Sequence, residues 1–161
     1  MGSGFGVKCK ACSASWEGSL GIGLRYSEER MKVTLTEPKS RGSMRLFSDD
    51  SEIQGEIASL MNQNASLLDY EHSAYLCAGC HWIESKFYIS IKTLAAEEIY
   101  TPKYKCSKCR NALIRIKMEQ NENDVQILDE KGNEIPWKCP LCNGTKLVKD
   151  NLSAQNDILW D

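Results

Sequence analysis

The residues with the clearest chemistry are eight cysteines, all of which fall into four Cys-x-x-Cys turns. The turns are Cys9/Cys12, Cys77/Cys80, Cys106/Cys109 and Cys139/Cys142. One such turn can aim both sulfurs at one metal ion about 2.3 Å away, and two turns complete a tetrahedron. Zinc suits four thiolates because it has no redox chemistry and no preferred d-electron geometry, and iron is the minor alternative. The sequence therefore predicts two zinc ions, each held by four cysteines.

Other uses of these cysteines are less consistent with the chain. A disulfide framework requires an oxidising compartment, and the opening MGSGFGVKCK lacks the pattern of a secretory signal. A thioredoxin-type redox pair uses one motif beside a βαβ unit rather than four motifs. Cys77, Cys80 and His81 match the attachment motif of c-type haem, but haem there would leave Cys9 and Cys12 without a partner pair.

The spacing does not determine which turns share an ion. Four turns allow three pairings, and the gaps between them are 64, 25 and 29 residues. Sequential pairing, first with second and third with fourth, is favoured because it leaves no nested loops, although loop-closure entropy changes too slowly with length to decide. It predicts two domains: residues 1–98, with a loop and helix inserted at about 27–70, and residues 99–161, which include a C-terminal tail.

Length and composition limit the class of protein. The chain has 161 residues, 42% of them hydrophobic, and two units of this size need metal ligation worth about 10 kcal/mol or more per site to fold. The sequence contains no apolar run of about 18 residues that would span a membrane. Paired thiols without an export signal predict a cytoplasmic protein. Two four-thiolate zinc sites lower the formal net charge from −2 to about −6, so no global attraction to nucleic acid is expected.

The elements that must position the turns are mostly strands. Strands are predicted on both sides of the first turn within 6–16, and at 30–35, 86–93, 99–105, 112–118 and 125–128. A helix is predicted at 51–63, where Ser51 and Gln54 have capping-box spacing and Ile53, Ile57 and Leu60 share a face. The fold class is therefore small, metal-stabilised and mainly β, with one inserted helix. This insertion is where a general metal scaffold would gain its particular function.

Three loop segments carry weaker signals. Gly21 and Gly23 predict a tight backbone passage rather than a phosphate loop, because the nucleotide-binding spacing is missing. The segment 36–45 is predicted to be a solvated loop, with anion binding by Lys39, Arg41 and Arg45 as the alternative. The tail 151–161 ends in Ile-Leu-Trp-Asp, and its apolar residues are expected to pack back on a metal-binding unit.

A basic segment surrounds the third turn. Its possible nucleic-acid contacts are Lys103, Lys105, Lys108, Arg110, Arg115 and Lys117. Between Thr101 and Lys117 there is no acidic residue, whereas 119–134 has six acids against one lysine. The cations could bind phosphates, with Tyr100 or Tyr104 stacking on bases. The alternative is that they stabilise the negative thiolate cluster beside them.

Catalysis has little support in the sequence. Four cysteines leave a zinc ion no open coordination position, and a catalytic zinc needs one. His72 and His81 are the only histidines, and no serine or spare cysteine is arranged to use either as a base. We therefore expect the protein not to be an enzyme.

The motifs resemble the zinc-ribbon superfamily, whose metal-binding knuckles look like those of rubredoxin. The order GFGVKCKAC, LGIGLRY, KCSKC…CPLC and a final Trp160-Asp161 is similar to that of small uncharacterised bacterial proteins with two zinc ribbons. The glycine that usually follows the second cysteine of a knuckle is replaced here by Ser13, His81, Arg110 and Asn143. The resemblance implies a cytoplasmic binding or adaptor protein.

These observations give one leading hypothesis and two alternatives. The leading hypothesis is a non-enzymatic two-zinc adaptor module that binds another macromolecule, preferably a protein, through the inserted helix and loop. The first alternative is a zinc-ribbon protein that associates with RNA or DNA through the basic segment 103–117. The second is a metal-handling or thiol-redox protein in which one site is labile.

Overall fold

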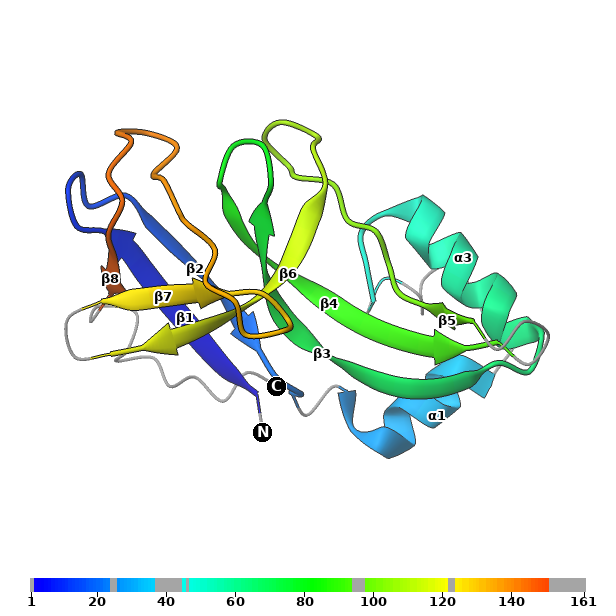
Figure 1. Ribbon diagram of the computed structural model, residues 1–161. Coiled ribbons are helices and arrows are strands. Elements are labelled where there is room, and N and C mark those ends of the chain that lie inside the picture. Colours follow the sequence, from blue (N-terminus) through cyan, green and yellow to red (C-terminus); the bar gives the residue numbers. More distant parts are fainter. Residues whose placement is uncertain are drawn as a thin grey trace.

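The computed structural model describes residues 2–23, 26–36, 45, 47–93, 98–121 and 124–150. Within these ranges the protein is mainly β, as predicted, with two sheets and two helices (Figure 1). Lys39 and Arg41, the segment 94–97 and the predicted docking tail 151–161 lie outside the described residues. Neither described helix has the length and apolar character needed to cross a membrane.

The smaller sheet joins the two ends of the described chain. Its strand order is β2-β1-β8, with β1 at Ser3–Cys9, β2 at Ser15–Leu20 and β8 at Leu147–Lys149. β1 and β2 form the predicted hairpin around the first cysteine turn, and β8 pairs with β1 so that Cys9 lies opposite Leu147. This pairing brings the fourth cysteine turn beside the first.

The larger sheet is antiparallel, with the strand order β5-β4-β3-β6-β7. Its strands are β3 (Ser66–Cys77), β4 (Ile83–Lys92), β5 (Ile99–Tyr100), β6 (Leu113–Gln120) and β7 (Val125–Leu128). β3 and β4 form a long hairpin around the second cysteine turn. β6 lies on the other side of β3, which places Cys77 opposite Leu113. The predicted strand at 99–105 is shorter than expected, because only its first two residues pair with β4 as a strand.

The predicted helix at 51–63 is confirmed as α3 (Ser51–Asn62), although its cap differs from the prediction. Asp50 is the N-cap, and its side chain accepts a hydrogen bond from the Glu52 N–H at 2.9 Å. The predicted partner Gln54 donates instead to the Ser48 carbonyl at 2.7 Å. Ile53 and Ile57 are buried as expected from their helical spacing.

The strand predicted at 30–35 is wrong, because Glu28–Thr36 forms a helix, α1. Met31 is buried while Val33 is 48% exposed, so the two do not share the buried face that a strand would give them. Glu28 and Glu29 lie in the first turn, where carboxylates interact favourably with the helix dipole. Positions 31 and 35 are also about one helical turn apart, so the apolar pattern of this short segment fits the helical period as well as the two-residue period of a strand.

Two hydrophobic cores support the two ends of the molecule. The helix-side core is built around Met31, Phe47, Ile57, Ile89 and Ile91 and includes Cys77 and Cys106. The hairpin-side core is built around Val7, Trp16, Leu76, Ile116 and Leu147 and includes Cys9 and Cys139. In every turn the first cysteine is therefore anchored in a core, which fixes where its sulfur lies.

Candidate metal centres

The eight cysteines form two groups whose sulfur atoms lie within 4.8 Å of one another. The outer cluster consists of Cys9, Cys12, Cys139 and Cys142, and the inner cluster consists of Cys77, Cys80, Cys106 and Cys109. The first turn thus pairs with the fourth and the second with the third, so the favoured sequential pairing is wrong. The predicted division of the chain into two domains, 1–98 and 99–161, depended on that sequential pairing. The clusters follow the sheets instead, because β1 lies beside β8 and β3 lies beside β6.

The sulfur geometry fits a tetrahedral ion and not a disulfide. In the outer cluster the sulfurs of Cys9 and Cys142 are 3.6 Å apart. In the inner cluster those of Cys77 and Cys109 are 3.3 Å apart. A tetrahedron with metal–sulfur bonds of about 2.3 Å has edges of about 3.8 Å, close to both distances. A disulfide would bring two sulfurs to about 2.05 Å, and all eight cysteines are free.

All four turns have the same backbone hydrogen bonds. In each, the N–H of the residue after the second cysteine donates to the carbonyl of the first cysteine at 2.9–3.0 Å. These donors are Ser13, His81, Arg110 and Asn143. The N–H of the first cysteine in turn donates to the carbonyl five residues later at 2.8–2.9 Å. The shared pattern identifies the four motifs as one structural unit used four times.

The same four donors occupy the left-handed region of backbone conformation. Their φ angles are 59° at Ser13, 59° at His81, 65° at Arg110 and 60° at Asn143. A side chain makes this conformation cost about 1–2 kcal/mol relative to glycine. The chain therefore keeps the geometry of a glycine-containing knuckle with other residues in that position.

Glycine at position 110 is expected to stabilise the inner turn. Arg110→Gly should raise the free energy of unfolding of the metal-loaded protein by about 1 kcal/mol relative to Arg110→Ala, because both variants lose the side chain and only glycine removes the left-handed strain. Chemical denaturation of the two variants measures the difference. Equal stability of the two variants would show that the φ angle of residue 110 carries no strain.

Hydrogen bonds to sulfur favour the thiolate form at Cys77 and Cys109 of the inner cluster. The N–H groups of Gly79 and Cys80 lie 3.4 Å from the Cys77 sulfur. A backbone hydrogen bond from Asn111, together with the thiol of Cys77, lowers the pKa of Cys109 to about 7. Burial raises the pKa of Cys80 to about 12. The inner cluster therefore contains one thiol whose pKa is lowered and one whose pKa is raised. A bound cation would favour the thiolate form of all four.

Glu84 holds the third turn against β4. One of its carboxylate oxygens accepts hydrogen bonds from the N–H and the hydroxyl of Ser107, both at 2.8 Å. Lys86 forms an ion pair with the other oxygen at 2.9 Å. Burial would raise the pKa of Glu84, but the bonds from Lys86 and Ser107 outweigh it and hold that pKa below its usual value. Glu84 thus positions the Cys106–Cys109 turn without being a ligand.

Three tryptophans connect the two clusters. Trp16, which follows the first turn, packs edge-on against Trp82 and Trp137 with ring centroids 5.7 and 5.5 Å apart. Trp137, which precedes Cys139, donates its indole N–H to the His81 carbonyl at 3.1 Å. The fourth turn is thereby tied to the second, although these turns belong to different clusters.

The six predicted nucleic-acid contacts are spread over several pockets. Lys103 and Lys105 line one pocket, Lys105 and Arg110 a second, and Arg115 and Lys117 a third. Lys108 lies over the ring of Trp82, 4.7 Å from its centroid.

Arg115 already has partners of its own. It forms an ion pair with Glu71 and another with Glu130 at 3.4 Å. Its guanidinium carbon also lies 3.5 Å from the centroid of Tyr88. Arg115 therefore stabilises the sheet, and its charge is partly neutralised by the two carboxylates.

His72 lies among aromatic rings rather than beside a nucleophile. Its ring contacts Tyr26 and Phe87 edge-on, with centroids 5.0 and 5.2 Å apart. Burial lowers the pKa of His72 to about 4, so the side chain is neutral at neutral pH. These contacts support a packing role for this histidine.

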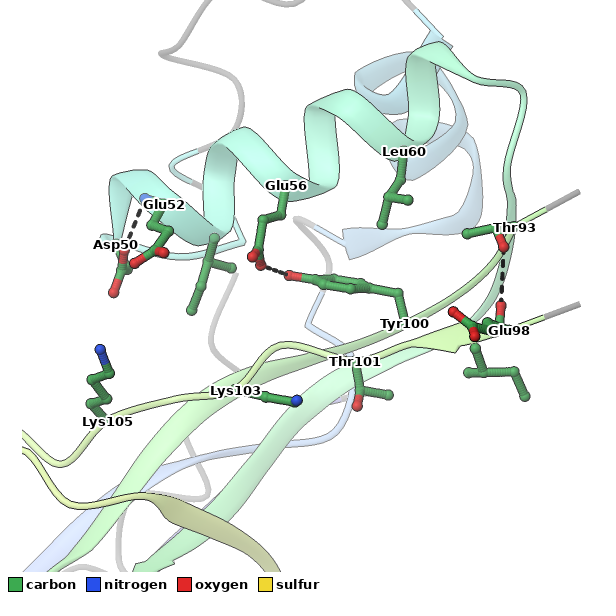
Figure 2. A pocket seen from close by; sticks show the side chains of 12 residues that line it. Asp50, Glu52, Glu56, Leu60, Thr93, Glu98, Tyr100, Thr101, Lys103 and Lys105 are labelled. Carbon is green, nitrogen blue, oxygen red and sulfur yellow. Dashed lines mark hydrogen bonds between the residues drawn. The ribbon is translucent and has the colours of Figure 1, made fainter. Parts of the chain in front are cut away.

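A groove that sequence reasoning missed lies between α3 and the segment that follows β4 (Figure 2). We call it the α3–β5 groove, and its volume is about 560 Å³. Its lining residues are Asp50, Glu52, Ile53, Glu56, Leu60, Thr93, Glu98, Ile99, Tyr100, Thr101, Lys103 and Lys105. The only sequence signal for it was the helix itself, since the opposing wall comes from a segment predicted to be an ordinary strand.

Comparisons with protein-family models, with curated proteins and with solved structures found no match to this chain. The two cysteine clusters and the surfaces around them are therefore the features that point to a function.

Proposed function

We propose that this protein is a zinc-binding, non-enzymatic module that recognises another protein through the α3 side of the molecule. The observation that carries the proposal is the composition of the two clusters, each of which supplies four sulfurs. Four thiolates fill the tetrahedral coordination of zinc and leave no position for substrate or activated water. The ions then act as structural cross-links between hairpins that are far apart in the sequence.

The α3–β5 groove supports a binding role. It combines apolar side chains such as Ile53 and Leu60 with carboxylates and lysines on its walls. Concave sites that mix apolar surface with a few polar groups are the usual form of binding sites. No cysteine is among the residues that line the groove, so a partner could bind there without contacting a sulfur atom.

Nucleic-acid binding remains the second candidate, and a specific pocket favours it. This pocket gathers the cations Arg45, Lys86, Lys105 and Arg110, two of which belong to the predicted basic segment. Asp49 and Asp50 line the same pocket and would repel phosphates. The balance of charge there is weaker than that of a dedicated nucleic-acid surface.

Site-specific photocrosslinking in cell extract tests the two candidates together. A benzoylphenylalanine residue at Glu52 reports on the α3–β5 groove, one at Arg110 reports on the basic pocket, and one at the exposed Glu119 of β6 is the control. We expect protein adducts from position 52 that are absent from position 119. Nuclease-sensitive adducts from position 110, with no specific protein adduct from position 52, would reject the proposal in favour of nucleic-acid binding.

A further inference from the structure

The α3–β5 groove has the dimensions of a short extended peptide. Its helical wall runs from Asp50 to Leu60, which spans about 15 Å at the rise of an α-helix. Four or five residues of extended chain cover about the same length. Tyr100 reaches from β5 toward the middle of this wall, where its hydroxyl donates to a Glu56 carboxylate oxygen at 2.6 Å (Figure 2). This bond holds the helix and the strand segment at a fixed separation.

One wall of the groove is the edge of the larger sheet. β5 is the last strand in the sheet order, so among the described residues no strand covers its outer side. The Glu98 carbonyl accepts a hydrogen bond from the Thr93 N–H at 3.1 Å and therefore faces β4. Because backbone groups alternate in direction along a strand, the N–H and carbonyl of Ile99 point away from β4. Thr101 is the next residue of that alternation, one position beyond the two paired residues of β5. An N–H at position 102 would face β4, so Pro102, which has none, cannot extend the pairing of β5 with β4 beyond Tyr100.

The side chains along this edge differ from those that usually protect one. Ile99 is 60% exposed, which is unusual for a large apolar residue on an edge strand. Natural edges are often blocked by lysines, and here Lys103 and Lys105 stand only beyond Thr101. The stretch from Ile99 to Thr101 is therefore open to pairing with a further strand.

The charge of the groove selects for a cationic occupant. The four carboxylates that line it are those of Asp50, Glu52, Glu56 and Glu98, against the two lysines. Figure 2 places Lys105 near Asp50, while Glu98 lies at the opposite end of the groove. Negative charge therefore remains at both ends of the groove, and at the open edge it is supplied by Glu98.

From these observations we propose that the α3–β5 groove binds an extended peptide segment that carries a lysine or arginine and pairs as an added strand with the Ile99–Thr101 edge. This proposal rests on the proposed protein-binding function and specifies its ligand. The backbone pairing supplies general affinity, and the Glu98 end supplies selectivity for the basic side chain. A nucleic acid is disfavoured because its phosphates would face four carboxylates.

Selection of random seven-residue peptides on the zinc-loaded full chain tests the proposal without knowledge of the natural partner. We expect enriched peptides to contain a lysine or arginine next to alternating apolar residues. Their affinity should fall about tenfold or more in Glu98→Lys and stay unchanged in Glu119→Lys, which makes the same change of charge at the exposed end of β6. Zinc content and melting temperature verify that both variants remain folded.

A second measurement separates strand pairing from other modes of binding. N-methylation of successive amides in a selected peptide should weaken binding at every second position only, because alternate amides of an added strand face the β5 edge. Equal sensitivity at all positions, equal loss in both charge variants, or no enrichment at all would overturn the proposal. Protein adducts from Glu52 in the photocrosslinking experiment would then still support the broader function, so the two failures can be distinguished.

Discussion

With zinc in both clusters, as proposed, removal of the two ions is expected to unfold the protein. Each structural site of this kind contributes about 10 kcal/mol or more to folding, whereas the net stability of a domain is about 5–15 kcal/mol. The first cysteine of every turn is packed in a core, so the loss of an ion leaves unpaired thiolates or thiols at buried positions. Without the ions, few interactions would remain at the cysteine turns to offset the conformational entropy that these hairpin ends lose on folding.

Chelator titration followed by native mass spectrometry and amide hydrogen exchange measures this effect. We expect each ion to be lost together with the exchange protection of the strands that its cluster joins, and zinc, but not magnesium, to restore the fold because magnesium prefers oxygen ligands. Loss of one ion from a protein whose amides all remain protected would contradict a structural role for that site. It would favour the metal-handling alternative.

The local structure around the cysteines could be predicted because each turn carries its own signal. Two-residue spacing determined the turns, and the strand predicted before the first turn is observed as β1, in which Val7 and Cys9 are buried. α3 was predictable for the same reason, since Ile53 and Ile57 repeat at the helical period. Each of these predictions needs only residues that are close in the sequence.

The pairing of the turns depends on contacts between distant segments. Closing the 25-residue loop between the middle turns shortens the path between the outer turns to about 95 residues. Because the free energy of loop closure rises only with the logarithm of loop length, this free energy differs by only about 0.2 kcal/mol between the nested and sequential arrangements. The strand pairing of β8 with β1 and of β6 with β3 decides the outcome instead. The α3–β5 groove escaped prediction for a related reason, because its two walls are some forty residues apart and meet only in the folded chain.

The nested arrangement predicts different consequences for equivalent substitutions in the two clusters. Cys109→Ser should unfold the protein, because the cluster to which this exposed cysteine belongs joins β3 to β6 within the larger sheet. Cys142→Ser removes an exposed ligand whose cluster joins only the short β8 to β1. Its effect should be confined to the outer cluster and the β8 end, since elements with few paired residues open independently of the rest.

Zinc stoichiometry and hydrogen exchange measure the two outcomes on matched variants that exchange the same atom. We expect Cys142→Ser to retain one zinc ion and the exchange protection of β3 and β4, with protection lost around Leu147. Cys109→Ser should retain no ion and lose protection throughout. Equal loss of protection in both variants would mean that the outer cluster supports the larger sheet as strongly as the inner one, through the contact of Trp137 with the His81 carbonyl. The difference between the variants therefore measures how far the two metal centres fold as separate units.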